Sequence, residues 1–232
     1  MRLPAFNVKG LGDKEKSTNL VNYLKDKKVD LALLTESHLT EARAKGLRQI
    51  YPSLGIISNA PSSNSVGVTW INLSPHKIPL EKLEVILQDT EGRALGIKCY
   101  IEGSQKAITL LGIYAPNGET AKVRSFKEAA SWAGASNPAQ AFDIVLGNWN
   151  AVLEPEDRNP HRSEDPRVTK ALLEVMEPGL LIDGWREAHP KTMEYTYTTS
   201  GNAKASSQID RILCKAHIYK QTEQWKIEQT PG

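Results

Sequence analysis

The sequence predicts a mixed α/β (α+β) fold built on two packed β-sheets, and three observations lead to this class. Strand-like apolar runs outnumber helical patterns along the 232 residues. Successive strands are often joined without a helix between them, whereas a simple doubly wound sheet would need a helix after each strand. No repeat or low-complexity tract divides the chain, and its length allows a core without disulfides. We therefore expect residues 1–232 to form a single domain.

The first part of the chain alternates strands and helices. Residues Val29 to Leu34 form a near-continuous apolar run, which is typical of a buried strand. Before it, apolar residues repeat at helical spacing, with Ser17 or Thr18 as the cap. The expected elements here are a strand at Arg2–Val8, a helix at Ser17–Lys28, a strand at Val29–Leu34, a helix at Glu41–Tyr51 and a loop at Asn59–Ser65.

Strands dominate the remainder. In the stretch Ala94–Ile101, Leu95, Ile97 and Cys99 stand at every second position and so fall on one face of a strand. The three prolines and many charges of Glu154–Arg167 indicate a surface loop. The other expected strands are Val66–Ile71, Ala107–Tyr114, Phe142–Leu146, Thr192–Thr199, Gln208–Cys214 and Gln224–Glu228, and the other expected helices are Ala121–Ala133 and Val168–Glu177.

Charge and cysteine content exclude several classes of protein. The net charge of +2 and the pI near 8.4 are only mildly basic, so overall charge does not argue for nucleic acid. Cys99 and Cys214 lie far apart and match no metal-binding spacing, which indicates a reducing compartment. The sequence shows no signal peptide and no window of membrane-spanning length. We expect an intracellular monomer, nuclear or cytoplasmic, without a membrane role.

Short polar islands follow or interrupt the predicted strands. They read Phe6-Asn7-Val8, Leu34-Thr35-Glu36-Ser37-His38, Ile113-Tyr114-Ala115-Pro116-Asn117, Leu146-Gly147-Asn148-Trp149-Asn150 and Ser207-Gln208-Ile209-Asp210-Arg211. Most of them stand where a buried strand reaches solvent. Acids, amides and a phenol gathered on one rim suit a metal-assisted attack on phosphate.

Each island also has an ordinary structural interpretation. The Glu36 carboxylate at its strand end must be paired, hydrated or bound to a cation, and the ordinary interpretation is a salt bridge with a nearby lysine. Asparagines at strand ends often make turns, and Tyr114 fits a core aromatic equally well. Asp210 cannot easily pair with Arg211, because adjacent strand residues point to opposite faces. The order of the islands and their occurrence together, rather than any single island, favour a functional site.

Taken together, the islands resemble the endonuclease/exonuclease/phosphatase superfamily. The chain looks most like the endonuclease domains of non-LTR retrotransposons, particularly those of fungi. Further stretches that carry the resemblance are Val152-Leu153-Glu154-Pro155-Glu156-Asp157-Arg158, Asp183-Gly184-Trp185-Arg186, Tyr195-Thr196-Tyr197 and Gln224-Trp225-Lys226-Ile227. It implies a four-layer sandwich of two mixed sheets flanked by helices. It also implies Mg²⁺-dependent cleavage of DNA, with a reverse transcriptase domain as a partner in a longer parent polyprotein.

The resemblance assigns a role to each matching position. It makes Glu36 the metal-binding carboxylate, with Asn7 beside it. It places Tyr114 on the phosphate with Asn117 in support. The other implied roles are Asn150 holding the attacking water or phosphoryl oxygens, Asp210 orienting a catalytic histidine, and Thr196 and Ser207 touching the DNA backbone.

Three departures from the family pattern affect the expected activity. Asn148 stands where the family motif Gly-Asp-x-Asn has its Asp, and an amide cannot accept a proton from water. The sequence stops at Gly232, before the family's Ser/Thr-Asp-His element and final strand. Gln208 replaces the basic residue of the Ser-Arg-Ile-Asp motif, which we interpret as a weakened phosphate contact.

We therefore expect weak Mg²⁺ binding and almost no turnover from this chain. Two alternatives stay open at this point. One is a catalytically dead, DNA-binding remnant of the same fold. The other is a relative that acts on a phosphorylated small molecule or lipid.

Overall fold

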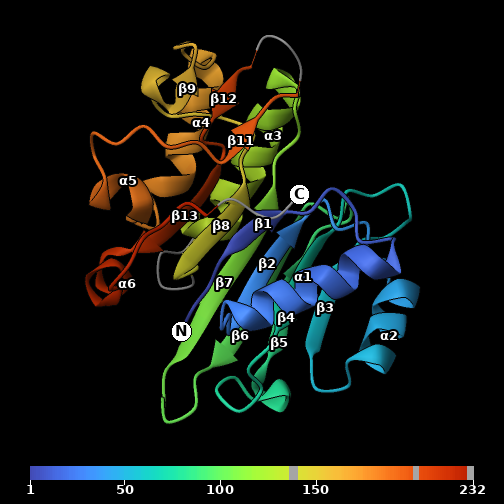
Figure 1. Ribbon diagram of the computed structural model, residues 1–232. Coiled ribbons are helices and arrows are strands. Elements are labelled where there is room, and N and C mark those ends of the chain that lie inside the picture. The colour runs from blue at the N-terminus through green and yellow to red at the C-terminus, as the bar shows by residue number, and fades with distance from the viewer. Residues whose placement is uncertain (136–140, 201–203, 229–232) are drawn as a thin grey trace. The chain divides into compact units, whose positions relative to one another are not determined.

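The computed structural model describes residues 1–135, 141–200 and 204–228, and the chain falls into two compact units, Met1–Tyr114 and Ala115–Gly232 (Figure 1). The elements of the first unit are β1 (Ala5–Asn7), α1 (Lys14–Asp26), β2 (Leu31–Thr35), α2 (Glu41–Ile50), β3 (Gly55–Asn59), β4 (Val68–Asn72), a 3₁₀ turn (Leu80–Lys82), β5 (Glu84–Gln88), β6 (Ala94–Tyr100) and β7 (Ala107–Tyr114).

The first unit contains two sheets packed face to face. One has the order β1-β2-β4-β3, with β1 and β2 parallel and the other pairs antiparallel. The strands β5, β6 and β7 form antiparallel neighbours in the other. Trp70 on β4 donates its indole N–H to the Leu95 carbonyl on β6 at 3.0 Å. Gly112 lets β7 approach closely, because a Cβ there would stand 2.3 Å from Leu33 Cδ1.

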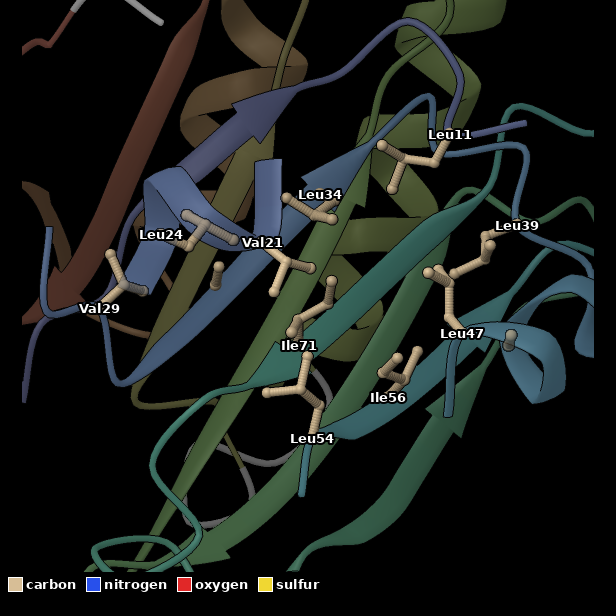
Figure 2. Packing of buried hydrophobic residues seen from close by; sticks show 12 residues of the cluster. Leu11, Val21, Leu24, Val29, Leu34, Leu39, Leu47, Leu54, Ile56 and Ile71 are labelled. Atoms are coloured by element: carbon tan, nitrogen blue, oxygen red, sulfur yellow. The ribbon is translucent and has the colours of Figure 1, made fainter. Parts of the chain in front are cut away.

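Helices cover the outer face of the four-stranded sheet. Figure 2 shows Val21 and Leu24 of α1 near Leu34 and Ile71 of the sheet, in one apolar cluster. The strand β2 is buried along all of its residues, as expected for a strand with a sheet on one side and a helix on the other. This packing fixes the end of β2, where the first polar island begins.

The second unit is built on antiparallel strands and two packed helices. Its elements are α3 (Glu119–Ala130), a π-helical turn (Ser131–Ala135), β8 (Ile144–Asn148), a 3₁₀ turn (Pro155–Asp157), β9 (Arg158–Asn159), α4 (Pro166–Met176), β10 (Leu181–Asp183), α5 (Gly184–Ala188), β11 (Tyr197–Thr198), β12 (Ser206–Ser207), β13 (Asp210–Lys215) and α6 (Ala216–Gln221). β13 lies between β8 and β10, and a small sheet has the order β11-β12-β9. Phe126 of α3 packs on Trp149 just after β8, with ring centroids 5.8 Å apart.

The predicted mixed α/β class, with mixed sheets flanked by helices, is confirmed, while several boundaries differ. Helix α1 begins at Lys14 rather than near Ser17, because the Asp13 carboxylate caps it by accepting the N–H groups of Glu15 and Lys16. The expected surface loop at Glu154–Arg167 contains a 3₁₀ turn and β9. The expected strand at Thr192–Thr199 is reduced to Tyr197–Thr198.

The segment Gln224–Glu228 was expected to be a strand and is not one. Its Trp225 ring packs against Gly184, where a Cβ would stand 2.1 Å from the ring. The His189 side chain also hydrogen-bonds the Trp225 carbonyl at 3.0 Å. Side-chain packing rather than a ladder therefore holds this segment. Among the described residues, none of the helices combines the length and apolar character needed to cross a bilayer.

Candidate active site

Asn7 and Glu36 meet at one corner of the first unit. The parallel pairing of β1 and β2 sets Asn7 opposite Thr35, so the residues that end these strands lie at the same edge. Asn7 Nδ2 donates a hydrogen bond of 2.8 Å to Glu36 Oε1. Asn7 Oδ1 accepts the Lys9 amide at 3.2 Å. The contact described for the Glu36 carboxylate is thus an amide and not the lysine that the ordinary interpretation supposed.

The backbone at this corner adopts an unusual conformation. Lys9, Glu36 and His38 all have positive φ angles near 50°, a backbone region that residues other than glycine seldom occupy. The Gly10 amide donates to the Glu36 carbonyl at 2.6 Å, and the His38 amide donates to the Val66 carbonyl at 3.0 Å. Such backbone conformations cluster at functional sites, where surrounding contacts hold them in place. The corner therefore presents its carboxylate from a fixed loop.

Tyr114 is the last residue of β7 and is buried, with 6% of its surface exposed. Its amide donates to the Arg93 carbonyl at 2.8 Å, and the Arg93 guanidinium lies 5.7 Å from the centre of its ring. Tyr114 is thus anchored beside a cation at a strand end. Asn117 lies three residues later, exposed in the turn before α3.

Asn148 and Asn150 form one hydrogen-bonded turn at the end of β8. Asn148 Oδ1 accepts the Asn150 amide at 2.9 Å, and Asn148 is almost fully buried. Asn150 has a φ of 46° and donates its side-chain amide to the Ala115 carbonyl at 2.7 Å. The Ala115 amide in turn donates to the Asn148 carbonyl at 2.8 Å. The two predicted amides therefore brace each other and the start of the second unit.

Asp210, Thr196 and Ser207 lie together around the start of β13. The ladder pairs Asp210 with Asn148, so two predicted site residues are cross-strand neighbours. Thr196 Oγ1 accepts the amides of Ile209 and Asp210 at 3.0 and 3.1 Å. The Thr196 amide donates to the Ser207 carbonyl at 3.1 Å. The hydroxyl of Thr196 thus shapes the backbone that carries Asp210.

The nine predicted site residues divide between the two units. Three of them, Asn7, Glu36 and Tyr114, belong to the first unit, and the other six belong to the second. The described contacts join Asn7 with Glu36 in the first unit. In the second unit they join Asn148 with Asn150 and Asp210, and Thr196 with Ser207 and Asp210. The convergence of Asn7, Glu36, Asn150 and Asp210 on one rim, with Tyr114 beside them, stays a prediction.

A buried ionic cluster beside Asp210 escaped sequence analysis. The Arg211 side chain is fully buried and donates to Asp183 Oδ2 and to Asp157 Oδ2, each at 2.5 Å. Arg186 also binds Asp157. Burial alone would raise the pKa of Asp157, but Arg211 and Arg186 outweigh it and hold this pKa below its usual range. The paired residues of this cluster lie 28 to 54 positions apart in the sequence, so no local motif reveals the cluster.

The structure gives Gln208 a different place from the one that its motif position suggested. Its side chain is 1% exposed, and its Oε1 accepts a hydrogen bond from Arg186 Nη2 at 2.8 Å. It therefore faces the ionic cluster rather than solvent. A weakened phosphate contact does not describe this residue.

The donor atoms for a metal are few. Within the described ranges, no three His, Cys, Asp or Glu side chains come together as a ligand set. Burial raises the pKa of both Cys99 and Cys214 to about 11, so the two thiols stay protonated near neutral pH. The Glu36 carboxylate and the Asn7 amide oxygen are the oxygen donors at the first corner. Such a set suits Mg²⁺, which commonly takes one or two carboxylates and completes its shell with water and substrate phosphate.

Comparison with known proteins extends the description of the fold. No family model matches the chain. It is 22% identical over 232 residues to the Transposon TX1 uncharacterized 149 kDa protein of Xenopus laevis, spanning all of this chain and 17% of that protein. It therefore covers only a small part of that relative's length.

Solved structures agree along nearly the whole chain. An AP endonuclease from Archaeoglobus fulgidus superposes with a TM-score of 0.74, at 19% identity over 95% of this chain and 89% of the other. The endonuclease domain of TRAS1, a telomere-specific non-LTR retrotransposon, gives 0.69, at 16% identity over 96% and 88%. The 3′ phosphatase NExo from Neisseria, bound to a product DNA hairpin, gives 0.71, at 19% identity over 95% and 88%. The chain therefore has the fold of the endonuclease/exonuclease/phosphatase superfamily, as its motifs predicted.

Proposed function

We propose that this chain is a DNA endonuclease domain of the retroelement type, whose chemistry is Mg²⁺-dependent hydrolysis of a phosphodiester. The observation that carries the proposal is the Asn7–Glu36 contact at the adjoining ends of two parallel strands. The similarity to a transposon protein and to a retrotransposon endonuclease domain supports the element type. The Neisseria relative bound to DNA supports the substrate class.

The side chains of both units have distinct roles in this proposal. Glu36 and the Asn7 amide oxygen would hold the cation, whose chemistry is to neutralise charge on the phosphoryl oxygens. Tyr114 would donate its hydroxyl to a phosphate oxygen, and Asn117 would support that contact. Asn150 would orient the attacking water. Thr196 and Ser207 would touch the DNA backbone next to Asp210.

Asn148 favours a second candidate, a DNA-binding domain with almost no turnover. Its carbonyl oxygen already accepts the Asn150 amide at 2.9 Å, and its NH₂ group can only donate. No atom of this side chain is then free to remove a proton from water. The loss of a positioned general base typically lowers a rate by about 100- to 10,000-fold. We therefore propose that the endonuclease lineage is impaired in this chain.

Nicking of supercoiled plasmid with Mg²⁺ tests both candidates. The proteins to compare are the parent chain, Asn148→Asp, the chain extended by a Ser-Asp-His element, and the chain with both changes. Because residues that act as a unit are not additive, we expect little nicking from either single change and clear nicking from both. EDTA and Glu36→Gln should each abolish that nicking.

Three outcomes would change the proposal. Robust EDTA-sensitive nicking by the parent chain would show that Asn148 does not impair it. Binding of DNA without nicking by any of the four proteins would favour the DNA-binding remnant. Displacement of DNA by low concentrations of inositol phosphates would point instead to a phosphorylated small molecule or lipid.

A further inference from the structure

The peptide from Ser207 to Asp210 connects β12, which ends at Ser207, to β13, which begins at Asp210, and its two central residues lie outside both strands. The Gln208 amide donates to the Asp157 carbonyl at 2.9 Å, and the Trp149 amide donates to the Ile209 carbonyl at 2.8 Å. The amides of Ile209 and Asp210 both go to Thr196 Oγ1. The Gln208 carbonyl accepts Arg211 Nη2 at 3.2 Å. Two main-chain bonds and the side chains of Thr196 and Arg211 therefore hold this peptide in place.

Arg211 is the centre of this arrangement. Its guanidinium reaches Asp157 in a 3₁₀ turn, Asp183 at the end of β10, and the Gln208 carbonyl. A planar guanidinium with several N–H groups can serve these three directions at once, whereas an ammonium on a flexible stem cannot fix them. The second cation, Arg186, balances the second carboxylate, so the four charged side chains sum to zero.

The cluster lies on the face of β13 opposite to Asp210. Adjacent strand residues point to opposite faces, so the Arg211 side chain is buried on one face of β13 and the half-buried Asp210 side chain lies on the other. Asp157 makes two contacts here: its carboxylate accepts a hydrogen bond from Arg211, and its main-chain carbonyl accepts one from the Gln208 amide. A shift of the cluster would therefore move the backbone that carries Ser207 and Asp210.

We propose that Arg211, with Asp157, is a positioning residue that fixes the 207–210 peptide and so sets how Ser207 meets the DNA backbone and where Asp210 lies beside it; the DNA part of this inference rests on the function proposed above. Arg211 touches neither substrate nor metal in this scheme. It acts through the Gln208 carbonyl and the Asp157 turn.

Hydrogen exchange of single amides on the parent chain tests the positioning directly. In Asp157→Asn and in the milder Arg211→Lys, the amides of Ile209 and Asp210 should exchange at least about tenfold faster, while the Leu213 amide in the ladder with Val145 keeps its rate. The matched control is Asp143→Asn, which breaks the 2.9 Å ion pair with Lys215 at the other end of β13. The control should leave the Ile209 and Asp210 amides unchanged.

Binding of a short DNA duplex in EDTA is the second readout. We expect Asp157→Asn and Arg211→Lys to weaken binding about tenfold, as misplaced contacts do, while Asp143→Asn binds like the parent chain. Exchange that rises equally at Ile209, Asp210 and Leu213 would mean a general loss of stability and would overturn the inference. If the parent chain binds no DNA, the proposed function fails, while the exchange pattern still decides whether Arg211 positions the peptide.

Discussion

Two carboxylates, Glu36 in the first unit and Asp157 in the second, differ in their burial and in the charge of their hydrogen-bond partners. Glu36 is half-buried and accepts one neutral amide donor, from Asn7. Asp157 is 1% exposed and binds two guanidinium groups, those of Arg211 and Arg186. A carboxylate that keeps oxygen lone pairs available can bind a cation, whereas one saturated by two arginines cannot. The contrast separates a candidate metal ligand from a structural anchor.

Removal of Arg211 should produce the largest effect on stability. Arg211→Met keeps the volume but leaves two buried carboxylates without their shared cation, which typically lowers the free energy of unfolding by about 3–5 kcal/mol. Glu36→Gln should change it by less than about 0.5 kcal/mol, because an amide oxygen can still accept from Asn7. Urea denaturation of both variants measures the difference. Equal effects would erase the distinction between the two carboxylates.

An extra charge in the cluster should also destabilise the second unit. Gln208→Arg would restore the family's basic residue, but it would place a third guanidinium in a neutral, buried group. We expect a loss of about 2–3 kcal/mol in the free energy of unfolding and no gain in DNA affinity. Denaturation and DNA titration of this variant provide the measurement. Tighter DNA binding at unchanged stability would show that position 208 faces the substrate and not the buried cluster.

The lowered pKa of Asp157 predicts a dependence of stability on acid pH. The folded chain holds the pKa of Asp157 below its ordinary value of 3.8, so the folded state takes up this proton less readily than the unfolded state. The resulting stability is present above about pH 4 and is lost as the pH falls through the folded value. Asp157→Asn should reduce the slope of unfolding free energy against pH below pH 4 by up to about 1.4 kcal/mol per pH unit. An unchanged slope would show that Asp157 does not contribute this linkage.

Sequence analysis succeeded where the signal is local. The run Ala107–Tyr114 predicted β7 with its observed bounds, because a largely apolar run and a following Pro-Asn-Gly mark a strand and its end. The Asn7–Glu36 corner followed from two strand ends, and parallel pairing brings these ends together. The family resemblance added roles that no single residue carries.

Sequence analysis failed where distant partners decide the structure. Arg211 looked like an ordinary strand residue, since its carboxylate partners lie 28 and 54 residues away. Gln208 looked like a surface residue for the same reason. The short strands β5 and β10 also went unpredicted, because their pairing with β6 and β13 outweighs weak local patterns.

Calorimetric titration of Mg²⁺ into the parent chain tests the central claim, that the Asn7–Glu36 corner is the metal site, most directly. We predict weak binding, since Mg²⁺ finds one carboxylate there and must keep most of its waters. Glu36→Gln should abolish this binding, whereas Glu102→Gln, which removes an exposed carboxylate between β6 and β7, should leave it unchanged. Tight binding that survives Glu36→Gln would place the metal elsewhere and contradict the account.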